Sequence, residues 1–345
     1  MSFLAHLRAL RPQQWSKNVF VLAAIPFAWG DRTLVAAGRD WSQVAGSVLA
    51  IALAFCLGSS AIYLLNDILD VDSDRRHPEK RRRPIAAGQV SIPVAWSLSI
   101  LCAAAALCTA ALLAAAALPL LATYMGLNLA YSLWLKRVVL VDAFCIAAGF
   151  LLRVLAGGSA ANIDISRWLL LCTLFLALFL ALNKRRSEIS LLGGDSAGHR
   201  AILAEYSLPL LDRLVTILAA CAILSYALYT IDAATAEKYG RDNGLVWSVP
   251  CVVFGISRYL LLVEKGHQGG NPTRVFLGGD RAFLINTLAW LALVLAAVAW
   301  PWLARAGDAL PVPGTPLAQL VFIGLAALTL THMLVVMHAA IRGWI

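Results

Sequence analysis

Charged residues are scarce in this chain. They make up 14% of its 345 residues, and apolar residues make up 61%, whereas a soluble domain averages roughly 25% charged and 45–50% apolar residues. The mean hydropathy is +0.77, and apolar runs long enough to cross a bilayer recur from end to end. No polar stretch is long enough for a soluble domain. The sequence therefore predicts an all-α polytopic membrane protein, because a helix satisfies its own backbone hydrogen bonds inside lipid.

Paired cysteines, glycine-rich phosphate loops and a cleaved signal sequence are also missing. The seven cysteines are scattered through apolar runs without a C-x-x-C pair, so we interpret them as small core residues. The Gly-Gly pairs are isolated and are typical of turns. The N-terminus lacks the basic, apolar and small-residue order of a signal peptide, so the first span is expected to act as its own signal.

Ten apolar segments are long enough to be spans. They cover residues 19–37, 43–66, 92–116, 118–135, 138–158, 167–183, 211–232, 245–263, 282–304 and 316–341. Ten spans place both termini on one side of the membrane. With the N-terminus in the cytoplasm, nineteen of the 28 Lys and Arg residues fall in cytoplasmic segments and six in outer ones. The positive-inside rule favours this orientation, so the long polar loops should face the cytosol.

One stretch, "YLLNDILDVDSDRRHPEKRRRPIAAG" at 63–88, sets an acidic cluster against a basic one. If the second span continues as a helix, Asn66, Asp67, Asp70 and Asp74 share one stripe, and Asp72 points elsewhere. Their oxygens suit Mg²⁺ shared with a phosphate group, and the bases that follow can neutralise the rest of a diphosphate. The alternative is a solvated helix end that carries a mixed-charge loop.

The segment "NDILDVDSD" resembles the first aspartate-rich motif of the UbiA-type intramembrane prenyltransferase superfamily. "LRPQQWSKNVFVLAA" and "VDAFCIAAGFLLRVLAGG" resemble one branch of it, the decaprenyl-phosphate phosphoribosyltransferases, and "YSLWLKR" at 131–137 also resembles the superfamily's pattern. The resemblance covers about residues 5 to 300. It implies a UbiA-like nine-helix core over residues 1–304, with an extra tenth helix in residues 305–345.

The resemblance also implies a reaction. The branch transfers 5-phosphoribose from 5-phosphoribosyl 1-diphosphate to a polyprenyl phosphate, and its product feeds decaprenyl-phosphate arabinose synthesis for the cell envelope. We therefore expect a Mg²⁺-dependent transferase in the bacterial cytoplasmic membrane, with its active site facing the cytosol. Membrane lipids are its expected surroundings, a homo-oligomer is left open, and no nucleic-acid partner is expected. Asp67, Asp70 and Asp74 are the expected catalytic residues, and Asn66 joins them as a metal ligand.

Further residues are candidates for holding the phosphates and the ribose. They are Lys17, Lys80, Arg83, Tyr131, Lys136, Arg153, Lys184, Arg185, Glu188 and Tyr206. The structural alternatives are positive-inside anchors for the bases and an interfacial aromatic for Tyr131. Arg153 is the least expected of them, because it follows Val138 by about 22 Å of helix, deep for a cytosolic site. A charge inside a span is nevertheless a functional candidate.

One departure from the superfamily pattern bears on the substrate. Where members that prenylate aromatic rings carry a second aspartate-rich motif, this chain has "NKRRSEISLLGGDSAGHRAILAEYSLPLLD". This basic segment favours a second phosphate-bearing substrate. The alternatives are prenyl transfer to an aromatic or quinone acceptor, lipid or ion transport, and a non-catalytic scaffold.

Overall fold

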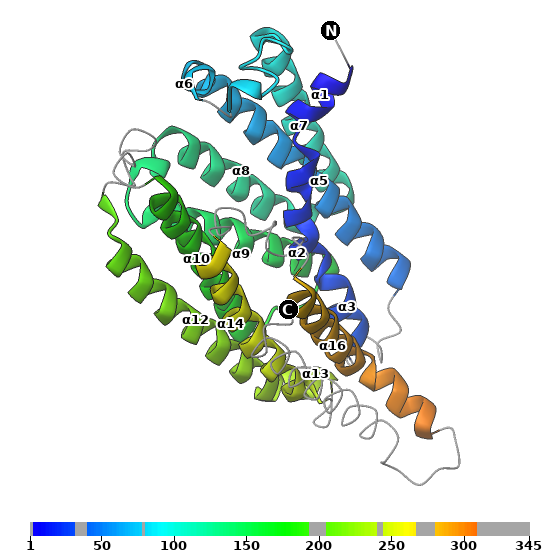
Figure 1. Ribbon diagram of the computed structural model, residues 1–345. Helices are drawn as coiled ribbons and strands as arrows, with labels where there is room; N and C mark the ends of the chain where they lie inside the picture. The colour runs from blue at the N-terminus through cyan, green and yellow to red at the C-terminus, as the bar shows by residue number, and fades with distance from the viewer. Residues whose placement is uncertain are drawn as a thin grey trace. The chain divides into compact units, whose positions relative to one another are not determined.

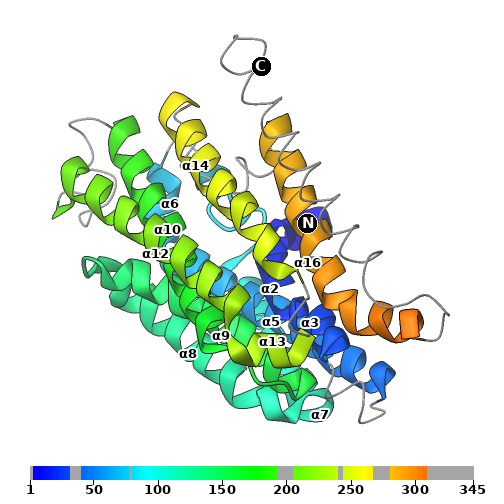
Figure 2. The ribbon, with the colours of Figure 1, turned by 90° about the horizontal axis from the view of Figure 1, so that it is seen from below.

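The computed structural model of the chain describes residues 3–31, 40–77, 80–192, 205–239, 244–266 and 280–308. These residues form helices and turns and contain no strand, so the all-α prediction is confirmed. The chain divides into two compact units. The first comprises Met1–Ile25 and Asp40–Ile165, and the second comprises Pro26–Arg39 and Ser166–Ile345. Figures 1 and 2 show the helices of both units.

The first unit contains the N-terminal helices and four long ones. Its elements are α1 (Phe3–Ala9), η1 (Pro12–Asn18), α2 (Val19–Leu22), α5 (Trp41–Leu69), α6 (Val71–Arg76), η2 (Lys80–Arg82), α7 (Ile92–Leu113), η3 (Ala115–Ala117), α8 (Leu118–Leu133), η4 (Leu135–Arg137) and α9 (Val141–Ala161). Helix α5 packs mainly along α7, and it also contacts α8 and α9. Asp40 begins α5 as its N-cap, because its carboxylate accepts a 2.9 Å hydrogen bond from the Ser42 N–H.

The second unit contains four further long helices. Its elements are α10 (Arg167–Leu192), α12 (Leu208–Ile231), α13 (Ala233–Tyr239), η7 (Leu245–Ser248), α14 (Val249–Gly266) and α16 (Arg281–Asp308), and α3 (Ala24–Gly30) crosses from the first unit into it. Helices α10 and α12 lie side by side (Figures 1 and 2). An aromatic core holds this unit together, with Tyr226, Tyr229 and Tyr239 packed against Leu293.

Eight helices of the described chain are long and apolar enough to cross a membrane. They correspond to the second to ninth predicted spans. The first predicted span, 19–37, differs: its described part is divided into α2 and α3. Pro26 has no N–H to donate to the Leu22 carbonyl, which explains why the helix is interrupted there. The tenth predicted span, 316–341, lies outside the described residues, and the division of the chain at residue 304 stays a prediction.

Close backbone packing positions α2 against α9. A Cβ added to Gly157 of α9 would lie 2.3 Å from the Val21 carbonyl oxygen of α2, so only glycine fits at that crossing. The contact fixes the N-terminal segment against the first unit, and this segment carries the sequence "QQWSKN". A small apolar core of Ala5, Leu64, Ile68 and Ile85 then packs α1 and the 85–90 turn around the end of α5.

Candidate active site

The acidic stretch lies where α5 ends and α6 begins. Helix α5 ends at Leu69, with Asp70 as its C-cap residue, and α6 starts at Val71. The Asp74 N–H donates to the Asp70 carbonyl oxygen at 2.8 Å, so helical spacing continues across the break. Asp67 and Asp74 are buried at 2% exposure, Asp70 is one-third exposed, and Asn66 is half-buried. The predicted stripe is therefore present, with one interruption at Asp70.

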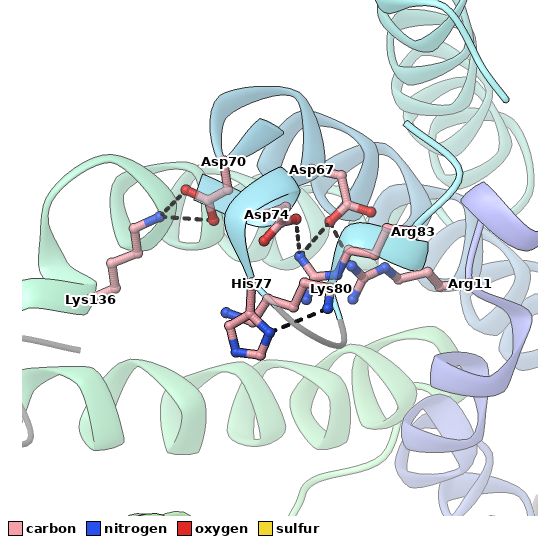
Figure 3. Close-up of polar contacts among 8 residues, drawn as sticks. All are labelled: Arg11, Asp67, Asp70, Asp74, His77, Lys80, Arg83 and Lys136. Atoms are coloured by element: carbon pink, nitrogen blue, oxygen red, sulfur yellow. Dashed lines mark hydrogen bonds and ion pairs between the residues drawn. The ribbon is translucent and has the colours of Figure 1, made fainter. Parts of the chain in front are cut away.

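Two arginines hold the buried carboxylates (Figure 3). Arg83 Nη1 lies between them, 3.1 Å from Asp67 Oδ1 and 2.5 Å from Asp74 Oδ2. Arg11 Nη2 approaches the same Asp67 oxygen at 2.5 Å. The backbone of Arg11 is in the left-handed region, with φ 53°, a conformation that costs a non-glycine residue about 1 kcal/mol or more.

Lys136 pairs with the third carboxylate. Its Nζ lies 3.1 Å and 3.4 Å from the two oxygens of Asp70, and it comes from η4, 66 residues along the chain. Figure 3 places Lys80 beside this cluster, and its backbone N–H donates to His77 Nδ1 at 3.3 Å. Tyr131 is half-buried near the end of α8, five residues before Lys136. The structure thus brings Arg83 and Lys136 to the aspartates, as the sequence predicts.

The donor chemistry of the cluster suits a divalent cation. Among the residues described, no group of three or more His, Cys, Asp or Glu side chains converges as a ready metal site. Asp67 and Asp74 nevertheless present oxygens to one cationic nitrogen, that of Arg83. Carboxylate oxygens of this kind are the hard ligands that Mg²⁺ binds. Binding of Mg²⁺ by Asn66, Asp67, Asp70 and Asp74 stays a prediction.

A second polar group lies deeper in the first unit. Lys17 Nζ is 3.5 Å from the Tyr63 hydroxyl, and the Asn18 amide donates to Cys56 Sγ at 3.1 Å. Burial lowers the pKa of Lys17, and the charges of Arg153 and Arg11 lower it further. Cys56 precedes Asp67 by eleven residues, about 16 Å of helix. The N-terminal segment therefore lies beside α5 about three turns before Asp67, toward the start of that helix.

Arg153 belongs to this deeper group, which accounts for its depth in α9. It is 5% exposed, and it donates 2.8 Å hydrogen bonds to Asn18 Oδ1, the Tyr124 hydroxyl and the Gly149 carbonyl. Its guanidinium carbon lies 4.5 Å from the centroid of the Tyr124 ring. The sequence placed Arg153 far from the cytosolic surface, and the structure connects it to Lys17 through Asn18.

The remaining candidates lie in the second unit. Arg185 is buried and donates to Glu188 at 2.8 Å, and Lys184 precedes it in α10. Arg186 pairs with Asp212 at the start of α12. Tyr206 is 5% exposed and precedes α12. A role of these residues together with the aspartates stays a prediction.

Four residues of the site were not among the sequence candidates. Arg11 and Asn18 belong to the segment "LRPQQWSKN", which also contains Lys17. Their membership of this segment could have identified them as candidates. Tyr63 opens the acidic stretch, three residues before Asn66. Tyr124 lies in an ordinary apolar run, and nothing local distinguishes it from a core residue.

Comparisons with known proteins agree with this architecture. Residues 23–204 match the UbiA prenyltransferase family model. Decaprenyl-phosphate phosphoribosyltransferase of Corynebacterium glutamicum is 36% identical over 299 residues, 85% of this chain and 86% of that protein. The protein of that name from Mycolicibacterium smegmatis is 37% identical over 303 residues, 85% of this chain and 92% of that protein.

Solved structures share the fold. A UbiA homolog from Archaeoglobus fulgidus bound to GPP and Mg²⁺ superimposes with a TM-score of 0.63 at 19% identity, covering 86% of this chain and 99% of that one. The same homolog bound to DMAPP and Mg²⁺ gives a TM-score of 0.61, also at 19% identity, covering 85% and 98%. At this identity the likeness establishes the fold.

Proposed function

The chain belongs to the UbiA prenyltransferase family and is a transferase, and from this premise we propose that it moves 5-phosphoribose from 5-phosphoribosyl 1-diphosphate to a polyprenyl phosphate. The observation that carries the proposal is the similarity, over 85% of the chain, to relatives named decaprenyl-phosphate phosphoribosyltransferase. The acid–base cluster supports it, because both substrates carry phosphates and the cluster supplies basic side chains to bind them.

The reaction is a displacement at C1 of the ribose. The bond between C1 and the diphosphate oxygen breaks, and an oxygen of the polyprenyl phosphate forms the new bond to C1. That oxygen is already anionic, so no strong general base is needed. Mg²⁺ would be held by Asn66, Asp67, Asp70 and Asp74. When bound, it would neutralise the negative charge that develops on the leaving diphosphate.

Basic side chains around the aspartates are proposed to bind the phosphate groups of the substrates. Arg83 and Lys136 lie within 3.1 Å of the carboxylates, so each can exchange a carboxylate for a diphosphate oxygen by side-chain rotation. Lys80, Tyr131 and the second unit's Lys184, Arg185, Glu188 and Tyr206 are proposed to contact the phosphates and the ribose. We place the reaction at the cytosolic face of the bacterial cytoplasmic membrane, where a soluble donor meets a lipid acceptor. The product would then feed decaprenyl-phosphate arabinose synthesis for the cell envelope.

Product formation by the purified chain in detergent tests the proposal. Radiolabelled 5-phosphoribosyl 1-diphosphate and a polyprenyl phosphate are supplied with Mg²⁺, and label is followed into the organic phase. EDTA-sensitive label in that phase is the expected result. Absence of label, together with turnover of a prenyl diphosphate and an aromatic acid, would replace phosphoribosyl transfer by prenyl transfer.

A further inference from the structure

A polar stripe runs along α5 from the aspartates into the apolar part of the first unit. It consists of Asp67, Tyr63, Ser60 and Cys56, spaced by three or four residues and so on one side of the helix. The N-terminal segment follows this stripe. The Ser60 hydroxyl donates to the Leu10 carbonyl at 2.8 Å and accepts from Trp15 Nε1 at 3.0 Å. Polar groups from two chain segments therefore meet along about 16 Å of helix.

Charge is balanced at one end of the stripe and unbalanced at the other. Each of the three aspartates contacts at least one base, as described above. The inner bases, Lys17 and Arg153, contact a phenol, an amide and a carbonyl. Arg153 is near enough to Lys17 to repel its charge, and among the described residues neither base has a carboxylate partner.

Such an arrangement is costly unless an anion joins it. Arginine keeps its charge in proteins, and a buried charge without a counter-charge is strongly unfavourable. The rings of Tyr124, Phe150 and Phe55 lie 4.5, 5.6 and 5.8 Å from the Arg153 guanidinium carbon. Their cation–π interactions offset only part of this cost. The aromatic rings attract the Arg153 guanidinium but do not neutralise its positive charge.

We propose that Lys17 and Arg153 form a subsite for a phosphate monoester, separate from the aspartate cluster. Two cations match the two negative charges of such a group at neutral pH, and the Arg153 fork can present two donors to its oxygens. The subsite rests on the proposed function, which supplies two phosphate monoesters: the lipid acceptor and the 5-phosphate of the sugar donor. Their shared chemistry is what the two side chains recognise.

A purely structural role for Arg153 is the competing explanation. Its hydrogen bonds tie α9 to η1 and α8, so its removal would loosen the unit whether or not a ligand binds. Lys17 separates the two explanations. It is half-buried and has one long contact, 3.5 Å to Tyr63, so its substitution leaves the packing of α9 in place.

Ligand affinity of the full-length chain in detergent tests the proposal. Farnesyl phosphate and ribose 5-phosphate are titrated separately by calorimetry into wild type, Lys17→Gln and Arg153→Lys. Arg75→Gln is the charge-matched control, because Arg75 is exposed and pairs only loosely with Asp72, at 3.5 Å. Loss of a charge-assisted contact weakens binding by about tenfold or more. We expect this loss in Lys17→Gln and no change in the control.

The two ligands identify the source of the phosphate. A loss for farnesyl phosphate alone assigns the subsite to the lipid, and a loss for ribose 5-phosphate alone assigns it to the donor. Wild-type affinity of Lys17→Gln for both ligands, or no binding of either by the wild type, overturns the proposal. Failure of the proposed function is visible separately: the wild type would then transfer no phosphoribosyl label although Lys17-dependent binding persists.

Discussion

Lys136 and Asp70 join two distant parts of the chain at the acidic cluster. The ammonium nitrogen lies 3.1 Å and 3.4 Å from the two carboxylate oxygens, and the side chains are 25% and 33% exposed. An ion pair this exposed contributes about 0–1 kcal/mol to stability. Folding therefore gives little reason for its place beside Asp67 and Asp74, and the proposed role of both residues in substrate binding gives one.

Asp70→Asn tests this explanation. We expect transfer of phosphoribosyl label to fall about 100-fold or more, because the substitution removes a charged ligand from the proposed diphosphate and Mg²⁺ site. The melting temperature should stay within a few degrees of wild type. Initial rates and thermal unfolding in the same detergent are the measurements.

Asp72→Asn is the matched control for that substitution. Asp72 is 84% exposed, lies two residues further on and contacts Arg75 at 3.5 Å, so the same chemical change is made away from the cluster. Its rate should match wild type. Near-normal turnover in Asp70→Asn, or an equal loss in Asp72→Asn, would contradict the assignment.

Asp67→Asn should affect stability more than Asp70→Asn does. Asp67 is 2% exposed and binds both Arg11 and Arg83, so its neutralisation leaves two partly buried guanidiniums with less counter-charge. Removing one partner of a buried ion pair costs about 3–5 kcal/mol, and the exposure of the arginines places the expected loss at the lower end. Thermal unfolding of both variants at one pH provides the comparison. Equal melting temperatures would show that burial of the Asp67 carboxylate has little energetic effect.

Most of the fold was predictable because a membrane-spanning helix depends on local properties of the sequence. These are the length of the apolar run and the hydrogen bonds within the helix. Eight spans follow from apolar length alone. The division of the first span was foreseeable at Pro26. The close crossing of α2 with α9 depends on Gly157, 131 residues later. Long-range contacts of this kind are set by packing, and no local pattern reports them.

The arrangement of the acidic cluster was predictable in part, and its role as a binding site stays a prediction. Asp67, Asp70 and Asp74 lie across the junction of α5 and α6, and helical spacing predicted that they follow one stripe. Arg83 follows in the next loop and was expected to neutralise a diphosphate, whereas in the structure it pairs with Asp67 and Asp74. Tyr124 contacts Arg153 only through the approach of α8 to α9, so its part in the site required the structure.

Gly157→Ala should destabilise the first unit. The added Cβ would meet the Val21 carbonyl oxygen at 2.3 Å, and that oxygen belongs to the backbone, so α2 must move. We expect a loss of about 1–3 kcal/mol, typical of overpacking, measured as reduced thermal stability in detergent. Gly126→Ala is the control, because nothing lies within 4 Å of its added Cβ. It should be neutral or stabilising, since alanine is the better helix former by about 1 kcal/mol. Equal effects of both substitutions would refute the close crossing of α2 and α9.

Phosphate binding at Lys17 should depend on pH, because only the charged ammonium attracts the phosphate. Burial, with the charges of Arg153 and Arg11, lowers the pKa of Lys17 in the folded protein below the ordinary lysine value of about 10.4. The charged ammonium then persists only below this lowered pKa. Binding of a phosphate to Lys17 should therefore weaken as pH rises through it, earlier than an exposed lysine would titrate.

Stability should change in the opposite sense over the same window. The unfolded chain holds the Lys17 proton up to the ordinary pKa, whereas the folded chain releases it earlier, so the free energy of unfolding rises with pH between the two values. The groups that face Lys17 are Arg153, Arg11, Tyr124 and Tyr63, and arginine side chains keep their charge in proteins. The phosphate ligand is already a dianion above pH 7. Farnesyl phosphate affinity and thermal unfolding of wild type and Lys17→Gln, measured from pH 7 to 10, test both trends. Parallel curves for the two proteins would show that Lys17 neither titrates in this window nor contacts the phosphate.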